Sequence, residues 1–385
     1  GVRLVGSEMC IRDRFLSGIG SSLAFLCINS SAAAKKTSIE QSGLAEVFKD
    51  RFRIGTAISS DTLVNNNSRL LRLIAREFNT ITAENDMKWE MIRPSLDNWN
   101  WEVADKFVEY GLENQMLMVG HALVWHAQIP DAVFFRNGKP KSKNEMLRIM
   151  ENHIGAVVDR YKHAISVWDV VNEAIDNNKW RKTNWYKQIG NEYFEKAFAL
   201  AREADPSAHL IYNDYGMDNP DKQDFLLLAI RRLKSKGIKV DGVGMQLHAA
   251  LDGPSAKQVE NAIVKFHKAG LQVHITEMDL DVLPKVDDYS GAEISTNYQY
   301  DERLNPYTEG LPDHIAKLHT ERYTELFEVF VKHSDKVARV STWGTVDSES
   351  WKNGWPVKGR TNYPLLFDRN YSPKEAYHSI INLAS

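Results

Sequence analysis

Cysteine is nearly absent from this chain of 385 residues. The two cysteines are Cys10 and Cys27, and both lie within the first 34 residues. A chain that lost those residues would have neither a disulfide framework nor a thiolate nucleophile. Its stability would come from its hydrophobic core alone, which suits a large single domain.

Strong charge of one sign is also absent. The formal net charge is −3 at pH 7, and no long block of like charges interrupts the chain. Such a chain lacks the concentration of positive charge that proteins use to bind nucleic acid or an anionic membrane. We therefore expect no nucleic-acid partner, and we expect a monomer.

No apolar run near the N-terminus is long enough to span a bilayer, so we expect no membrane span. The run that ends in Leu23–Ile28 follows Arg12 and Arg14 and precedes the small residues Ala32–Ala34. A basic region, a short apolar region and small residues in this order are typical of a secretory signal peptide. A disordered tail is the alternative interpretation of this segment.

The N-terminal segment is expected to lie outside the folded domain. A lipoprotein signal would use Cys27, but Leu26 stands where such a signal usually has a small residue. The residues before Arg14 resemble translated upstream sequence, so residues 1–34 are predicted to be a spurious extension plus a signal peptide. Residues 35–385 would then be secreted, to the periplasm or to the outside of the cell.

Linkers rich in proline, glycine or serine are absent after Lys35, which predicts one domain. Short apolar or β-branched runs alternate with longer amphipathic segments, as in βα units around a parallel sheet. Eight such units in one domain predict a closed (β/α)8 TIM barrel, an α/β fold. The predicted strands are Arg53–Ser59, Thr80–Asp86, Leu117–Trp125, Ser166–Ala174, His209–Tyr215, Gly242–His248, Val273–Asp279 and Val337–Gly344.

Helices and one long loop are predicted between these strands. Residues 69–78 and 222–236 carry apolar side chains at helical spacing. Asp281–His319 is polar and contains three prolines, so we predict a long loop insertion after the seventh strand that shapes a substrate cleft. Left-handed C-terminal caps are predicted at the glycines that follow three helical stretches, Gly111, Gly237 and Gly270.

Polar residues follow nearly every predicted strand. Active sites of such barrels lie at the carboxyl ends of the strands. A single polar residue there is usually solvated or caps the next helix, but a ring of them indicates a functional site. The ring contains Glu84, Asn85, Lys88, His121, Trp125, His126, Gln128, Asn172, Glu173, Asn213, Asp214, Gln246, His248, Glu277, Asp279 and Trp343.

Two carboxylates in this ring stand out, because Glu173 and Glu277 each follow an apolar strand. Glycoside hydrolysis needs such a pair: one carboxyl protonates the leaving oxygen and the other attacks the anomeric carbon. Either glutamate alone would be read as a buried ion pair or a helix cap, but the two together predict catalysis. Asn172 would then bind a sugar 2-hydroxyl, and His248 and Asp279 would orient Glu277.

These motifs resemble those of glycoside hydrolase family 10, the family of endo-β-1,4-xylanases. The resemblance runs from about Leu44 to Leu383. At Met278 the family more often has another apolar residue, and the loop Asp281–His319 is longer than in its simplest members. The motifs that carry the resemblance are Thr82–Trp89, Gly120–His126, Trp168–Ala174, Gln246–His248, Ile275–Leu280 and Trp343–Gly344.

The resemblance implies a retaining endo-β-1,4-xylanase that acts on xylan and xylo-oligosaccharides without a cofactor. It implies that Glu173 is the acid/base, that Glu277 is the nucleophile and that Asp279 belongs to the supporting network. It also implies that Gln128 and Trp351 fill the space that the hydroxymethyl group of glucose would need. The implied substrate-binding residues are Glu84, Asn85, Lys88, His121, Trp125, Gln128, Asn172, Gln246, His248, Trp343 and Trp351.

Three alternatives stay open at this point. The first is another barrel glycosidase, which either acts on other β-1,4-glycans, such as cellulose fragments, or removes single xylose or arabinose units from chain ends. The second is a non-catalytic sugar-binding protein on the same fold, although pseudoenzymes usually lose a catalytic carboxylate and both are present here. The third is a metal-dependent hydrolase, which would need clustered ligands. His121 and His126 lie in a motif that resembles a sugar site, so we predict no metal.

Overall fold

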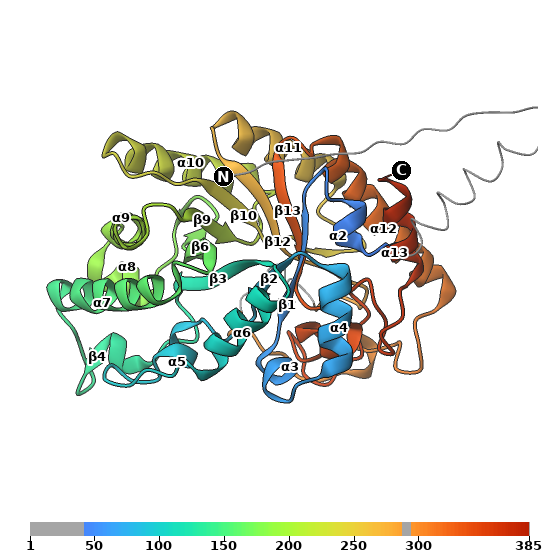
Figure 1. Cartoon of the computed structure of the whole chain (residues 1–385), viewed down its shortest axis with the longest axis horizontal. Helices are drawn as coiled ribbons and strands as arrows, with labels where there is room; N and C mark the ends of the chain where they lie inside the picture. Colours follow the sequence, from blue (N-terminus) through green and yellow to red (C-terminus); the bar gives the residue numbers. More distant parts are fainter. Residues whose placement is uncertain (1–41, 287–293, 385) are drawn as a thin grey trace, which may run out of the picture. The chain divides into compact units, whose positions relative to one another are not determined.

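The computed structural model describes residues 42–286 and 294–384, and the predicted signal segment lies outside them. Within these residues the main sheet has the strand order β10-β9-β6-β3-β2-β1-β13-β12-β11. A further pairing of β10 with β12 closes this sheet into a ring of parallel strands (Figure 1). The predicted (β/α)8 barrel is therefore confirmed.

The strands of the ring begin within one residue of the predicted positions. Most of them end slightly earlier than predicted, because the chain leaves the hydrogen-bonded ladder where the polar residues of the ring begin. Their bounds are β1 Arg53–Ile58, β2 Thr80–Ala83, β3 Leu117–Val124, β6 Ile165–Asn172, β9 His209–Asp214, β10 Gly242–Met245, β12 Gln272–Asp281 and β13 Val337–Thr342, while β11, His248–Ala250, extends the pairing of β12.

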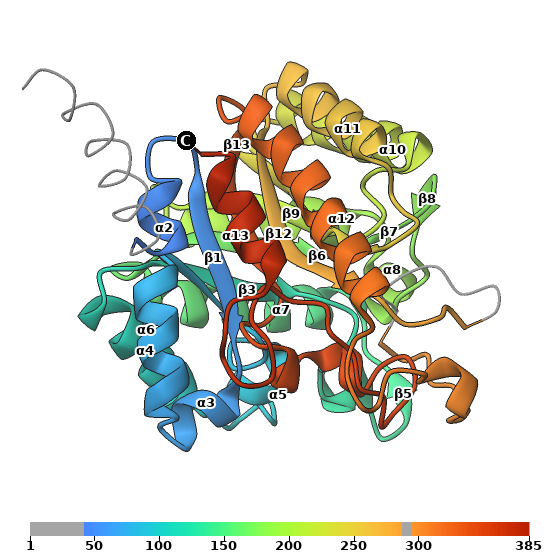
Figure 2. The ribbon, with the colours of Figure 1, turned by 90° about the vertical axis from the view of Figure 1, so that its right-hand side faces the viewer.

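Helices surround the barrel (Figures 1 and 2). They bury one apolar face each, as α4 does with Leu70, Leu73 and Ile74. The longer helices are α4 Ser68–Glu77, α6 Glu102–Glu113, α7 Lys143–Tyr161, α9 Glu192–Ala204, α10 Pro220–Ser235, α11 Ala256–Lys268, α12 Asp313–Lys332 and α13 Glu375–Asn382. The shorter ones are α2 Leu44–Val47, α3 Ser60–Val64, α5 Trp89–Ile92 and α8 Asn184–Ile189. Two hairpins, β4 Phe135–Arg136 with β5 Lys139–Pro140 and β7 Ile175–Asp176 with β8 Lys179–Trp180, lie in the loops.

Two of the three glycine caps are confirmed. Gly237 and Gly270 follow α10 and α11 with φ of 77° and 82°, in the left-handed region. The prediction for Gly111 is wrong, because this residue lies inside α6. A Cβ atom at Gly111 would lie 2.3 Å from Sδ of Met118 on β3. The glycine therefore permits the close approach of helix and strand, and the helix ends two residues later.

Glu77 joins the two ends of the described chain. Its Oε2 accepts a hydrogen bond from the Leu44 amide at 3.1 Å and another from the Tyr377 hydroxyl at 2.8 Å. Leu44 begins α2, which precedes β1, and Tyr377 lies in α13. The first and last helices are thus fixed to one buried carboxylate at the end of α4.

The long connection after β12 is present, although residues 287–293 of the predicted insertion lie outside the described residues. Residues 313–319 belong to α12, so the predicted loop extended too far. The Tyr298 amide donates to the Pro356 carbonyl at 2.9 Å, and Asn305 accepts from the Thr361 amide at 2.8 Å. These bonds fix the connection to the segment after β13, at the carboxyl end of the barrel.

Among the described residues, none of the helices has the length and apolar character needed to cross a membrane.

Candidate active site

Glu173 and Glu277 lie at the carboxyl end of the barrel on strands separated by two others. Glu173 follows β6, Glu277 lies in β12, and β9 and β10 stand between them in the sheet order. Asn213, on β9, and Gln246, after β10, occupy the space between. Both glutamates are buried, with 4% and 5% of their surface exposed.

Glu173 is held by two neutral donors. Its Oε2 accepts a hydrogen bond from Trp125 Nε1 at 2.8 Å, and its Oε1 accepts one from Gln246 Nε2 at 3.0 Å. The amide of Asn172 lies 3.3 Å from the same Oε1. Burial disfavours the charged form and raises the pKa of Glu173, although a charge on His126 opposes the change. A carboxyl with a raised pKa keeps its proton to higher pH, as a proton donor must.

The backbone of Glu173 is held as firmly as its side chain. The residue has φ of 54°, in the left-handed region that L residues rarely adopt. Its amide donates to the Asn213 carbonyl at 2.9 Å, and its carbonyl accepts from Arg181 Nε at 3.0 Å. The next amide, of Ala174, donates to the Tyr212 hydroxyl at 3.0 Å. Such backbone strain persists where surrounding contacts over-determine it, typically at functional sites.

Glu277 is contacted by an amide and by a histidine that pairs with a second carboxylate. Its Oε1 accepts from Asn213 Nδ2 at 2.6 Å, and its Oε2 lies 3.3 Å from His248 Nε2. His248 Nδ1 in turn lies 3.0 Å from Asp279 Oδ2. The structure therefore contains the predicted chain from Asp279 through His248 to Glu277.

The charges along this chain keep Glu277 ionised. Burial opposes the charged form of His248, but Asp279 and Glu277 outweigh it and raise the pKa of His248 to about 9. Burial would likewise raise the pKa of Glu277, yet the hydrogen bond and positive charge of His248 and the hydrogen bond from Asn213 lower it. A carboxylate that stays ionised suits a nucleophile, so the two glutamates differ in the way that acid and nucleophile must.

A second group of predicted residues lies together around Lys88. Its Nζ donates to Asn85 Oδ1 at 3.0 Å and to Gln128 Oε1 at 2.9 Å, and it lies 4.8 Å from the centre of the Trp125 ring. Burial lowers the pKa of Lys88 and raises that of Glu84, while the attraction between the two charges opposes both changes. The group presents amides and a carboxyl that can bind hydroxyl groups.

His121 and Trp343, two of the residues predicted to bind substrate, lie next to each other. Their ring centres lie 5.2 Å apart, and His121 Nδ1 lies 2.7 Å from Asp169 Oδ2. Lys88 Nζ is 6.0 Å from the Trp343 ring. Trp343 therefore stands between His121 and the group around Lys88.

Trp351 has a role that the sequence did not indicate. Its Nε1 donates to Asp279 Oδ2 at 2.7 Å, so it contacts the support of Glu277 directly. Its ring stacks on Trp355 with centres 4.5 Å apart, and Lys352 Nζ lies 4.6 Å from the Trp351 ring. Gln128, its proposed partner in sugar choice, lies instead in the group around Lys88.

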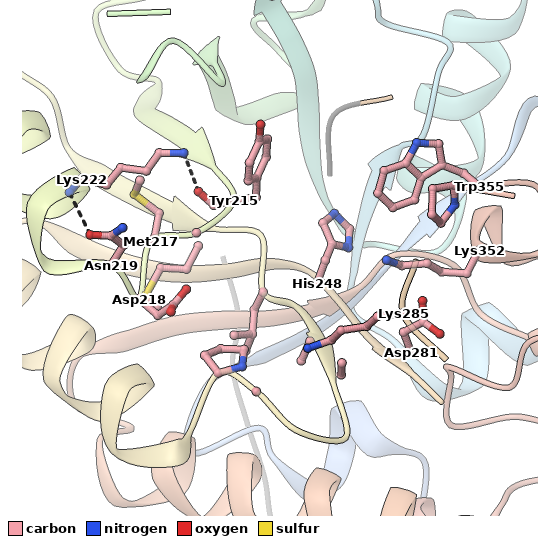
Figure 3. A pocket seen from close by; sticks show the side chains of 18 of the residues that line it. Tyr215, Met217, Asp218, Asn219, Lys222, His248, Asp281, Lys285, Lys352 and Trp355 are labelled. Atoms are coloured by element: carbon pink, nitrogen blue, oxygen red, sulfur yellow. Dashed lines mark hydrogen bonds between the residues drawn. The ribbon is translucent and has the colours of Figure 1, made fainter. Parts of the chain in front are cut away.

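A cavity of about 530 Å³ lies between loops that follow β6, β9, β10 and β12 and the segment after β13, and His248, the neighbour of Glu277, is among the residues that line it. Figure 3 shows Tyr215 and Lys222 on one side of it and His248, Lys352 and Trp355 on the other. Arg181, which holds the Glu173 backbone, also lines it. Of these residues, sequence reasoning singled out His248 alone, because the others lie in loops or helices outside the recognised motifs.

The described residues contain no group of three or more histidine, cysteine or acidic side chains arranged to hold a metal ion.

Known proteins similar to this chain match nearly all of its described length. The family described as "Glycosyl hydrolase family 10" matches residues 43–383. A protein of Xylanibacter ruminicola named "Endo-1,4-beta-xylanase A" is 41% identical over 345 residues, which are 89% of this chain and 94% of that protein. A "Thermostable celloxylanase" of Thermoclostridium stercorarium is 38% identical over 355 residues, 88% of this chain and 87% of that one. The solved structure of a "GH10 endoxylanase retrieved from sugarcane soil metagenome" is 48% identical, with a TM-score of 0.86, and the match covers 89% of this chain and all of that one.

Proposed function

The chain belongs to glycosyl hydrolase family 10, and from this membership we propose that it hydrolyses internal β-1,4-xylosidic bonds of xylan with net retention. One observation carries the assignment of roles: burial raises the pKa of Glu173, whereas His248 lowers that of Glu277. Two carboxyls whose environments push their pKa values apart are the mark of an acid and a nucleophile.

The proposed reaction has two displacements. In the first, the Glu277 carboxylate attacks the anomeric carbon while the glycosidic bond breaks and Glu173 gives its proton to the leaving oxygen. In the second, the Glu173 carboxylate takes a proton from water, and the water oxygen attacks the same carbon as its bond to Glu277 breaks. Two inversions restore the β configuration, and Glu173 ends protonated as it began.

The cavity of about 530 Å³ is the proposed place of the sugars on the leaving-group side. Arg181 supports this placement, because it lines the cavity and also donates to the carbonyl of Glu173, the proposed proton donor to the leaving oxygen, at 3.0 Å. The group around Lys88 would bind the sugars on the other side of the bond.

A product analysis tests this function. Incubation with xylan should give a mixture of xylo-oligosaccharides, with far slower release of sugar from cellulose, and proton NMR should show the β-anomer of each new reducing end first. Initial release of the α-anomer would contradict retention. Faster hydrolysis of cellulose would favour the second candidate, a β-1,4-glucanase, which the name of the celloxylanase relative suggests.

His248→Ala should slow formation of the covalent intermediate by about 10–100-fold, the usual cost of removing a group that orients a reacting one. Without the positive charge of His248, the pKa of Glu277 should rise, so the acid side of the pH profile should move to higher pH. Stopped-flow release of phenol from an aryl xylobioside measures the step. The exposed His163→Ala is the matched control, and a wild-type burst rate in His248→Ala would remove His248 from the mechanism.

Sugar choice gives another prediction. Replacing both Gln128 and Trp351 by alanine should raise the ratio of kcat/KM for an aryl cellobioside over an aryl xylobioside by about tenfold, because one small group discriminates by roughly 1–3 kcal/mol. Trp351→Ala also removes a hydrogen-bond donor to Asp279, so kcat/KM should fall for both substrates. Only the ratio of the two kcat/KM values therefore tests sugar choice. The exposed Gln115→Ala is the control. An unchanged ratio would place sugar choice elsewhere, most plainly in the connection after β12.

Export is a separate proposal that rests on the sequence of residues 1–34 alone. N-terminal sequencing of protein recovered from outside the cytoplasm tests it, and a start near residue 35 is the expected result.

A further inference from the structure

A buried cation lies in the barrel core beneath the two glutamates. Arg339 belongs to β13 and has 2% of its surface exposed. Its Nε donates to His274 Nδ1 at 3.2 Å, and its Nη1 lies 3.4 Å from both Thr82 Oγ1 and Ser341 Oγ. A guanidinium does not lose its proton in proteins, so its charge must be balanced within the core.

The neighbouring histidines do not balance it. His274 accepts a hydrogen bond at Nδ1, so this nitrogen carries no proton and the ring is neutral. Nε2 of the same ring lies 3.0 Å from Nε2 of His209. Burial and the charge of Arg339 lower the pKa of His274 well below its usual value, and burial lowers that of His209. The balancing anion must therefore come from elsewhere.

Asp169, on β6, is that anion. It has 1% of its surface exposed, and its Oδ1 lies 3.9 Å from Arg339 Nη2. Within the part of the chain that the structure describes, neither of these two buried atoms has a hydrogen-bond partner. Each carries charge that the other can offset, which makes the pair an ion pair.

The other oxygen of Asp169 reaches the active site. Its Oδ2 lies 2.7 Å from His121 Nδ1. An ionised carboxylate only accepts hydrogen bonds, so Nδ1 must carry the proton, and Nε2 of a neutral ring is then an acceptor. His121 lies against Trp343, with ring centres 5.2 Å apart.

We propose that Arg339 is a positioning residue, whose buried charge keeps Asp169 ionised so that His121 holds its proton on Nδ1 and offers Nε2 to a sugar hydroxyl. The identity of that sugar rests on the proposed function, but the tautomer of His121 does not. Without Arg339, Asp169 would be a buried carboxylate with no cation, and protonation would relieve that cost. The Asp169–His121 pair would take up one proton from solvent, so that either the ring carries a proton on both nitrogens or Asp169 donates to Nδ1 and the ring proton lies on Nε2. In both states Nε2 is a donor in place of an acceptor.

Three variants separate this role from a structural one. Arg339→Met and Arg339→Gln remove the charge, and Arg339→Gln keeps polar atoms near His274 in case the first variant does not fold. Arg339→Lys keeps the charge and should preserve the tautomer. Arg322→Met, at a buried arginine of α12 that pairs with Glu325, is the matched control for loss of a buried arginine far from the proposed site.

The readout is long-range proton–nitrogen NMR of the imidazole groups of the free enzyme, with the His121 signals assigned by their loss in His121→Gln. Wild type, Arg339→Lys and Arg322→Met should show Nδ1 protonated and Nε2 unprotonated, whereas the neutral variants at 339 should show Nε2 protonated in a large share of the molecules. The neutral variants should also lose about 10–100-fold in kcat/KM on an aryl xylobioside, a loss that Arg339→Lys largely restores. An unchanged His121 tautomer in a folded neutral variant would overturn the proposal. Inactivity of the wild type on xylosides would contradict only the proposed function.

Discussion

Glu173→Ala should lower the turnover of xylan by about 10²–10⁴-fold, the usual contribution of a positioned general acid. The natural leaving group is a poor one and needs the proton that Glu173 supplies. An aryl xylobioside with a good leaving group needs little protonation, so its first step should lose much less. Its second step lacks the base that activates water, so the covalent intermediate should accumulate and give a burst of phenol.

The pH profile of the same variant is a second readout. Glu173 must be protonated in the free enzyme, so kcat/KM of the wild type should fall as pH rises through its raised pKa. Glu173→Ala should lack that basic limb. Azide should speed the second step and give the β-xylosyl azide, because it attacks from the side that water uses. Xylan turnover within about tenfold of wild type would contradict the assignment.

Glu277→Ala should have the largest effect, a loss on the order of 10⁵-fold with every xyloside, because no covalent intermediate can form without the nucleophile. A good leaving group should not rescue it, in contrast to Glu173→Ala. Azide or formate can occupy the space of the lost carboxylate and attack the anomeric carbon directly. The product should then be the α-anomer, the opposite of that from Glu173→Ala.

Covalent labelling checks the same residue in the wild type. A 2-fluoro xylobioside with a good leaving group should form a stable ester, and peptide mapping should find it on Glu277. Glu277→Gln, which keeps the shape but removes the charge, is the control that should take no label. A label on any other residue would overturn the assignment.

The sequence predicted the barrel and the position of Glu173 and Glu277 at the carboxyl ends of its strands, because both depend on local patterns. Apolar runs marked where each strand begins, and Glu173 and Glu277 stood directly after or within such runs. The residues that line the cavity were harder to find. Arg181 lies beyond a hairpin and Lys352 in a short turn, and neither position has a periodic pattern that marks it. Their partners become apparent only when loops from different strands come together.

Gly111 and Arg339 show what a local sequence pattern cannot predict, the first by a wrong prediction and the second by a missed contact. Gly111 was interpreted as a cap, because a glycine after an apolar stretch usually is one, and only its approach to Met118 reveals the true reason for it. Arg339 carried a signal that was not used, since a charged residue within a buried strand is rare and is almost always paired. Its partner Asp169 is 170 positions away in the chain, a separation that no local pattern covers.

The contacts of Glu77 with Leu44 and Tyr377 bear on how this domain can be combined with others. Both ends of the barrel domain are anchored at the amino ends of the strands, whereas the glutamates lie at the carboxyl ends. A module fused before α2 or after α13 would therefore leave from the face opposite the cleft and would not obstruct a polysaccharide chain. The same proximity makes the domain a good scaffold for circular permutation, since a short linker between the two helices could join them and new termini could be opened in a distant surface loop.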